Sequence, residues 1–130
     1  MKNYNRNDNP ILKLTFEFSL EIIKYCEALE EQRKFNMARQ LFRSGTSIGA
    51  NATEAQHAES KADFIHKFKI AAKEMNETEY WLLLCQHAQN YPDCNHLLTS
   101  LEEIKKVLNK IIASSIRKNP FSYILSLFLL

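Results

Sequence analysis

A stripe of small and apolar side chains over residues 38–55 limits the possible folds more than any other feature of this chain. The side chains recur at spacings of three and four, and they are Ala38, Leu41, Gly45, Ile48, Ala52 and Ala55. This spacing defines one face of an α-helix, and Phe42 and Gly49 widen that face. Each glycine costs a helix about 1 kcal/mol relative to alanine. Two glycines on one face therefore predict that a second helix packs very closely here.

A second line of the same predicted helix carries polar side chains, which are Gln40, Ser44, Ser47, Asn51 and Glu54. Amides and hydroxyls compete for backbone hydrogen bonds and are unfavourable inside helices. We interpret this line as groups that are hydrogen-bonded within the fold or across a subunit interface, because buried polar groups are nearly always paired. Contacts with a ligand or a nucleic acid are the alternative interpretation.

The phase of the apolar pattern resets near residues 56–60, which predicts a turn and a helical hairpin. A new apolar register begins at Phe64 and continues to Cys85. Ser60 and Asp63 have the spacing of a capping box, which marks the start of a helix.

Two glutamates, Glu74 and Glu77, lie on a second line of this third helix, between isoleucine and tryptophan. Buried carboxylates need partners. The expected partners are Arg39, Arg43 and Asn51 on the preceding helix.

Four periodic segments joined by short links predict an all-α protein, an antiparallel up-and-down four-helix bundle. The expected helices cover about residues 10–31, 36–57, 61–89 and 93–118. Large apolar residues alternate strictly over residues 12–20, as in a strand. The alternation stops at residues 22–23 and no turn follows, so we favour a helix there.

The ends of the elements follow from local signals. Asn9 precedes a proline at the first helical position, and Asn36 is the expected cap of the second helix. Asp93 or Asn95 is expected to cap the fourth helix. Residues 1–9 are polar and should be frayed. The apolar tail 120–130 should pack on the bundle or on a neighbouring subunit.

Composition and charge exclude several classes of protein. The net charge of +2 is too small to predict nucleic-acid binding by itself. The polar start of the chain is unlike a signal peptide, and no apolar run reaches the roughly 20 residues of a membrane span. We therefore expect a cytoplasmic protein whose three cysteines are reduced.

Motifs for catalysis and metal binding are weak, so we expect no enzyme, no cofactor and no metal. The pairs Cys85–His87 and Cys94–His96 do not have a recognised zinc spacing. Glu54-x-x-His57 resembles half of a di-iron site, but the first and fourth predicted helices offer no inward acid. Phosphate-binding glycine loops and nucleophile elbows are absent from the sequence.

The segments SxxSIGANATEA and ESKADFIHKFKIAAKEMNETEYWL resemble a bacterial four-helix-bundle family named for the intervening sequences of 23S ribosomal RNA genes. The family includes the accessory variability protein of diversity-generating retroelements. The matching residues are Gln40, Leu41, Arg43, Ser44, Ser47, Ile48, Asn51, Glu54, Glu59, Ser60, Lys61, Phe64, Lys73, Glu74, Glu77, Thr78, Tyr80, Trp81 and Leu82. The resemblance covers about residues 10–118. The family usually has glycine where this chain has Ala55, which leaves the position of the turn open.

The resemblance implies a homopentameric ring, and its retroelement members bind nucleic acid and a reverse transcriptase, although they are more basic than this chain. We therefore expect a non-enzymatic oligomeric protein that binds RNA, DNA or a nucleoprotein. The expected contacts are Arg39, Lys69, Lys105, Lys106 and Lys110. The alternative is a structural or protein-interaction module with no nucleic-acid role.

Self-association is also expected from the residues themselves. The first and third predicted helices carry second apolar lines, which consist of Leu12, Phe16, Ile23 and Cys26 on one and Ile70, Trp81 and Leu84 on the other. Exposed apolar patches of this kind usually mark interfaces.

Overall fold

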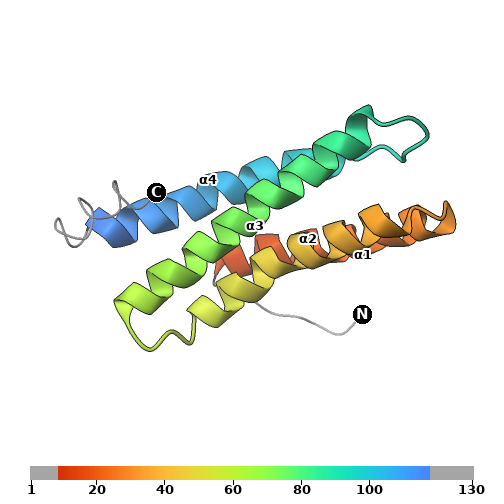
Figure 1. Cartoon of the computed structure of the whole chain (residues 1–130). Helices are drawn as coiled ribbons and strands as arrows, with labels where there is room; N and C mark the ends of the chain where they lie inside the picture. The colour runs from red at the N-terminus through yellow and green to blue at the C-terminus, as the bar shows by residue number, and fades with distance from the viewer. Residues whose placement is uncertain (1–8, 118–130) are drawn as a thin grey trace.

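Four helices and no strand make up residues 9–117, the part of the chain that the computed structural model describes (Figure 1). The helices are α1 (Pro10–Glu31), α2 (Phe35–Ala55), α3 (Lys61–His87) and α4 (Asn95–Arg117). Helices adjacent in sequence pack on each other, and α4 returns to α1. The all-α, four-helix architecture expected from the sequence is therefore confirmed. The expectations for residues 1–8 and for the tail 120–130 lie outside the described residues.

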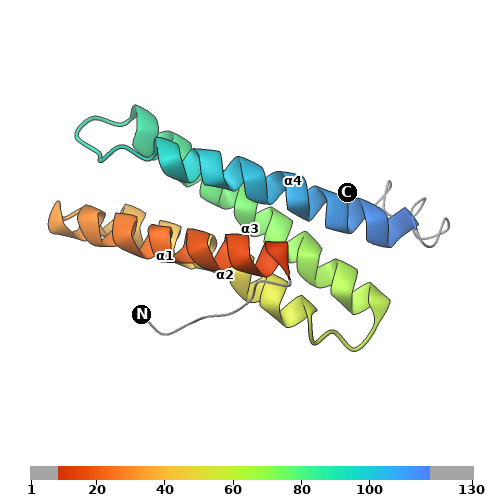
Figure 2. The same cartoon turned by 180° about the vertical axis from the view of Figure 1, so that it is seen from behind.

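The helices form a bundle in which α2 and α3 lie toward the viewer in Figure 1, whereas α1 and α4 lie toward the viewer in Figure 2. Arg43 pairs with Glu74 while Glu54 pairs with Lys67, so α2 and α3 run antiparallel. None of the helices in residues 9–117 has the length and apolar content that a membrane crossing requires.

The turn between α1 and α2 is a Schellman motif built without glycine. Arg33 has a left-handed backbone with φ of 62°. Its N–H donates to the carbonyl of Glu30 at 2.8 Å, and the N–H of Lys34 donates to the carbonyl of Leu29 at 2.8 Å. Lys34 is therefore the residue before α2, and Asn36, predicted as the cap, lies inside the first turn. The prediction was wrong because the chain leaves α1 within two residues, so that α2 begins at Phe35, after Lys34, which makes no side-chain cap hydrogen bond.

The start of α3 matches the predicted cap in part. Ser60 Oγ accepts a hydrogen bond from the N–H of Asp63 at 3.0 Å. The Asp63 carboxylate accepts from the N–H of Glu59, at 3.3 Å, one residue earlier than in a capping box. The turn nevertheless lies where the phase of the apolar pattern resets.

α4 begins differently from the prediction. The carbonyl of Cys94 accepts hydrogen bonds from the N–H groups of Leu97 and Leu98, at 3.0 and 3.1 Å. Cys94 therefore occupies the cap position that was predicted for Asp93 or Asn95. Its thiol donates to the carbonyl of Leu82 at 3.3 Å, which fixes the connection onto α3.

The two glycines of α2 mark its closest approach to α1. A Cβ at Gly45 would lie 2.9 Å from Ile22 Cγ1, and a Cβ at Gly49 would lie 3.2 Å from Thr15 Cβ. A Cβ at Gly45 would therefore force Ile22 or the helices to shift, and one at Gly49 would make an unusually tight contact with Thr15. The close packing predicted from the small-residue stripe therefore occurs against α1.

Burial differs from the predicted faces at two positions. Phe42, expected to widen the inner face of α2, is 51% exposed, whereas Cys26, expected on an outer line of α1, is only 3% exposed. The Cys26 thiol donates to the carbonyl of Ala38 at 3.3 Å. The start of α2 therefore covers this side of α1, which the period of a single helix could not reveal.

Candidate functional site

The polar residues predicted on α2 and α3 meet at the seam between these helices, around Arg43. Its guanidinium pairs with Glu74 at 3.3 Å and also with Glu77. The same group donates to the side-chain oxygen of Gln40 at 3.4 Å. The Arg43 side chain is half exposed, and ion pairs at such exposure contribute only about 0–1 kcal/mol. The network therefore positions side chains more than it stabilises the fold.

This network continues into two aromatic residues of α3, the partly buried Trp81 and the exposed Tyr80. Trp81 Nε1 donates to the Glu77 carboxylate at 3.1 Å. Tyr80 packs edge-on against Trp81 with ring centroids 5.4 Å apart, and it is 58% exposed. Buttressed aromatic side chains of this kind are enriched at protein interfaces. Arg43, Glu77 and Trp81 thus hold an exposed tyrosine in a fixed place.

Of the other residues on the polar line of α2, Ser47 and Asn51 form hydrogen bonds within α2, and Glu54 forms one with α3. Ser47 donates to the carbonyl of Arg43, and Asn51 donates to the carbonyl of Ser47 at 2.8 Å. The Asn51 amide therefore bonds within α2 and not to the glutamates of α3, contrary to the sequence-based expectation. Glu54 does reach α3, where it accepts from Lys67 at 3.0 Å. This hydrogen bond and the charge of Glu54 raise the pKa of Lys67.

Ser44 has a different environment from the rest of this line, because it is fully buried. Among the described residues, its hydroxyl is the buried side-chain polar group without a hydrogen-bond partner. Leaving a buried hydroxyl unpaired costs about 1–3 kcal/mol. The small volume of serine, and not a hydrogen bond, explains its place in the α2 core.

The predicted anion contacts lie on three of the four helices. Lys69 lies on α3 and Lys105, Lys106 and Lys110 lie on the adjacent helix α4, where the last two are exposed. Arg39 is exposed beside Glu30 and Phe35 on the outer side of α1 and α2. The bundle therefore brings the lysines to neighbouring helices and leaves Arg39 apart from them.

The three cysteines are buried, free and unreactive in character. Burial raises the pKa of Cys26 to about 12 and that of Cys85 to about 11, and it raises the pKa of Cys94 as well. The Tyr25 hydroxyl, whose pKa burial also raises, donates to the carbonyl of Pro92 at 2.8 Å. A thiol must ionise to act as a nucleophile. These cysteines therefore belong to the core of the bundle.

The cysteine–histidine pairs do not come together. Cys85 and Cys94 point into the core, whereas His87 and His96 are exposed. Within residues 9–117, no group of three or more histidine, cysteine, aspartate or glutamate side chains has an arrangement that could hold a metal ion.

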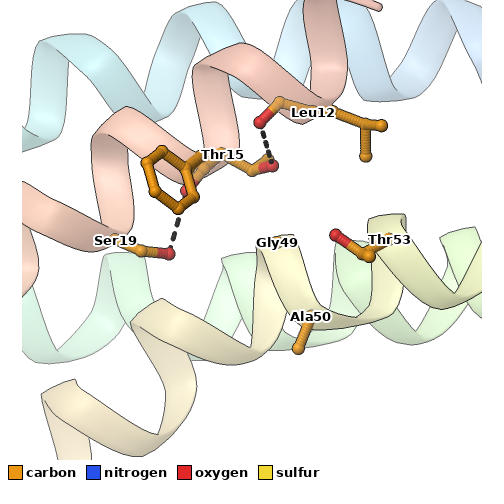
Figure 3. Close-up of a pocket in the computed structure, with 7 residues that line it drawn as sticks. Leu12, Thr15, Ser19, Gly49, Ala50 and Thr53 are labelled. Carbon is orange, nitrogen blue, oxygen red and sulfur yellow. Dashed lines mark hydrogen bonds between the residues drawn. The ribbon is translucent and has the colours of Figure 1, made fainter. Parts of the chain in front are cut away.

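A shallow groove of about 410 Å³ lies between α1 and α2 (Figure 3). Gly49 and Ala50 form its floor, and Thr15 and Ser19 line the α1 side. The hydroxyls of Thr15 and Ser19 donate to α1 carbonyls, at 2.7 and 2.9 Å, so the groove is mainly apolar. Thr15 was not predicted at this contact. Its burial could have been predicted from its spacing, because Thr15 lies one turn after Ile11 and one turn before Phe18, both of which are buried on the same face of α1.

Comparisons with known proteins agree on one family. A family model described as "23S rRNA-intervening sequence protein" matches residues 7–110. The chain is also similar to a crystal structure, at 1.70 Å resolution, of a protein of unknown function from the S23 ribosomal protein family of Bacteroides thetaiotaomicron. The two are 41% identical over 78% of this chain and 97% of that chain, with a TM-score of 0.73. The comparison with curated proteins gave no match.

Proposed function

The chain belongs to the 23S rRNA-intervening sequence protein family, and on that premise we propose that it is a non-enzymatic, ring-forming protein that binds RNA or DNA. The family name refers to 23S ribosomal RNA, and the name of the similar crystal structure refers to the ribosome. A folded ribosomal RNA segment is therefore the first partner to test. The resemblance noted from the sequence suggests a ring of five copies.

The distribution of charge supports an anionic partner. α4 carries Lys105, Lys106, Lys110 and Arg117 against two glutamates, whereas α1 carries five glutamates against two lysines. Lysines contact phosphates as point charges and release counterions when they do so. The single observation that carries this part of the proposal is the lysine cluster on α4.

The ion pairs of Arg43 and the raised pKa values of the cysteines support a binding role over a catalytic one. Arg43 forms ion pairs with Glu74 and Glu77 at the α2–α3 seam. The buried thiols have raised pKa values and stay protonated near neutral pH. Groups tuned for acid–base or nucleophilic chemistry would instead carry pKa values near the working pH.

Assembly with further copies is supported by exposed apolar side chains on several helices. Phe35 and Phe42 of α2 are 52% and 51% exposed, and Tyr80, Leu83 and Leu84 of α3 are 58%, 40% and 39% exposed. Clusters of exposed apolar residues usually mark interaction sites. Two separate clusters suit a ring, in which each copy has two neighbours.

Fluorescence anisotropy with a labelled 23S ribosomal RNA fragment tests the nucleic-acid part of the proposal. The wild-type chain should bind, and the affinity should fall linearly on a log–log plot as salt rises. Lys106→Gln and Lys110→Gln should each reduce the salt slope by about 1. Lys13→Gln, at an exposed lysine of α1, should leave the slope unchanged. Absence of binding at low salt, or equal effects of all three variants, would refute the lysine cluster as the contact.

A second candidate is a protein-interaction module with no nucleic-acid role. The small net charge of +2 and the exposed aromatic residues favour it. This candidate predicts that the chain assembles normally but shows no salt-dependent binding to RNA or DNA.

A further inference from the structure

A cleft of about 620 Å³ runs between α1 and α4, on the side of the bundle seen in Figure 2. It exists because α1 packs less closely on α4 than on α2. Leu14, Leu20 and Ile23 of α1 line its apolar wall.

Carboxylates surround this apolar wall. Glu17 and Glu21 of α1 and Glu103 of α4 line the cleft, together with one cation, Lys24. Lys24 pairs with Glu21 at 3.3 Å, and His96 lies 3.9 Å from the same carboxylate. Glu17 and Glu103 are exposed. The cleft therefore suits a helix that carries both apolar anchors and lysines.

The outer face of α3 has this composition. Lys69, Lys73, Tyr80 and Leu84 are spaced by four, seven and four residues, which places them on one helical face. We call these four residues the α3 stripe. Tyr80 is 58% and Leu84 39% exposed. Glu77 borders the stripe and pairs with Arg43. The charged residues of the stripe itself are the two lysines, so the stripe is positive.

We propose that the α3 stripe of one copy docks into the α1–α4 cleft of the next copy. The lysines would face Glu17 and Glu103, and Tyr80 and Leu84 would cover the apolar wall. Docking of an amphipathic helix face into a groove is a common mode of recognition.

The helix that carries the stripe, α3, lies toward the viewer in Figure 1, whereas α1 and α4, which line the cleft, lie toward the viewer in Figure 2. Each copy therefore offers one stripe and one cleft to two different neighbours. Contacts of this head-to-tail kind build rings when the rotation between copies closes. This inference rests on the self-assembly proposed above. It assigns Lys69 to the subunit contact and leaves the α4 lysines for an anionic partner.

Charge reversal of each surface tests the docking, with sedimentation velocity of the full chain as the readout. The cleft variant is Glu17→Lys with Glu103→Lys, and the stripe variant is Lys69→Glu with Lys73→Glu. Each should weaken self-association by roughly a hundredfold, because like charges would then face each other. A chain that carries all four changes should assemble again, because its reversed stripe matches its reversed cleft.

Matched controls change the charge equally elsewhere. Glu27→Lys with Glu31→Lys and Lys106→Glu with Lys110→Glu alter exposed residues outside both surfaces, so both should assemble like the wild type. Circular dichroism melts establish that each variant is folded. Full assembly of the cleft or stripe variant, or failure of the fourfold variant to reassemble, would overturn the docking. If the wild type assembles while the docking fails, the proposed self-assembly still stands; a monomeric wild type would refute both.

Discussion

Replacing Gly45 by alanine tests the closest packing in the bundle. A Cβ at this position would lie 2.9, 3.0 and 3.1 Å from Cγ1, Cδ1 and Cγ2 of Ile22. Ile22 is fully buried. A β-branched side chain in a helix has essentially one χ1 rotamer, so Ile22 cannot rotate out of the way. The added methyl group must push α1 and α2 apart.

The size of the effect follows from two opposing terms. Alanine gains about 1 kcal/mol of helix propensity over glycine, while overpacking a well-filled core costs about 1–3 kcal/mol. We therefore expect Gly45→Ala to lower the free energy of unfolding by about 1 kcal/mol. In an Ile22→Ala background the three clashing atoms are absent. There the same substitution should raise the free energy of unfolding by about 1 kcal/mol.

Urea unfolding followed by circular dichroism measures both backgrounds, at one fixed protomer concentration because assembly shifts apparent stability. Ala50→Gly, at an exposed position of α2, provides the control for helix propensity alone. If Gly45→Ala stabilised the chain equally in both backgrounds, the helices would be further apart than we describe.

Three further predictions concern the core and the polar line. Tyr25→Phe should cost about 1 kcal/mol, because it removes the hydroxyl bond to the Pro92 carbonyl, and a urea midpoint unchanged from wild type would count against that bond. The pKa values of Cys26 and Cys85 rise from 9.0 to about 12 and about 11 on folding, so the contribution of these thiols to stability is complete below about pH 9 and is lost as the pH rises toward 11. The free energy of unfolding should therefore fall between about pH 9 and pH 11, and a rise over this range would contradict the burial of the thiols. Asn51→Leu should cost under about 1 kcal/mol, because the amide bonds within its own helix, and a larger loss in thermal melts would reveal a partner beyond the chain.

The sequence was sufficient for the fold because periodicity reports the buried face of each helix. The six residues of the predicted apolar stripe of α2 are all buried, whereas Phe42, which was expected to widen that face, is exposed. The strand-like alternation over residues 12–20 belongs to α1, in which Phe18 and Ile22 face the core. The phase reset near residues 56–60 located the turn because two successive helices present their apolar faces at different angles.

Features set by tertiary contacts could not be predicted from one helix at a time. The cap at Cys94 depends on its thiol reaching the carbonyl of Leu82. The burial of Cys26 depends on where α2 begins. The α1–α4 cleft depends on how far two helices separate, and spacing along the chain contains no information about that distance.

The candidate site was predictable in part. Glu74 and Glu77 were expected to need a basic partner on α2, and Arg43 is placed to supply it. Arg39 does not join this network because it lies one turn nearer the beginning of α2, beside Glu30 and Phe35. The support that Trp81 gives to Tyr80 was not predicted, since adjacent residues on a helix usually point in different directions.

Sedimentation equilibrium of the full chain at micromolar concentration tests the central claim most directly. The protomer mass is 15.2 kDa. A closed ring predicts one species at a whole multiple of that mass, about 76 kDa for five copies, which persists as the concentration is lowered. A single species at 15.2 kDa would contradict the claim that this protein acts as an assembly.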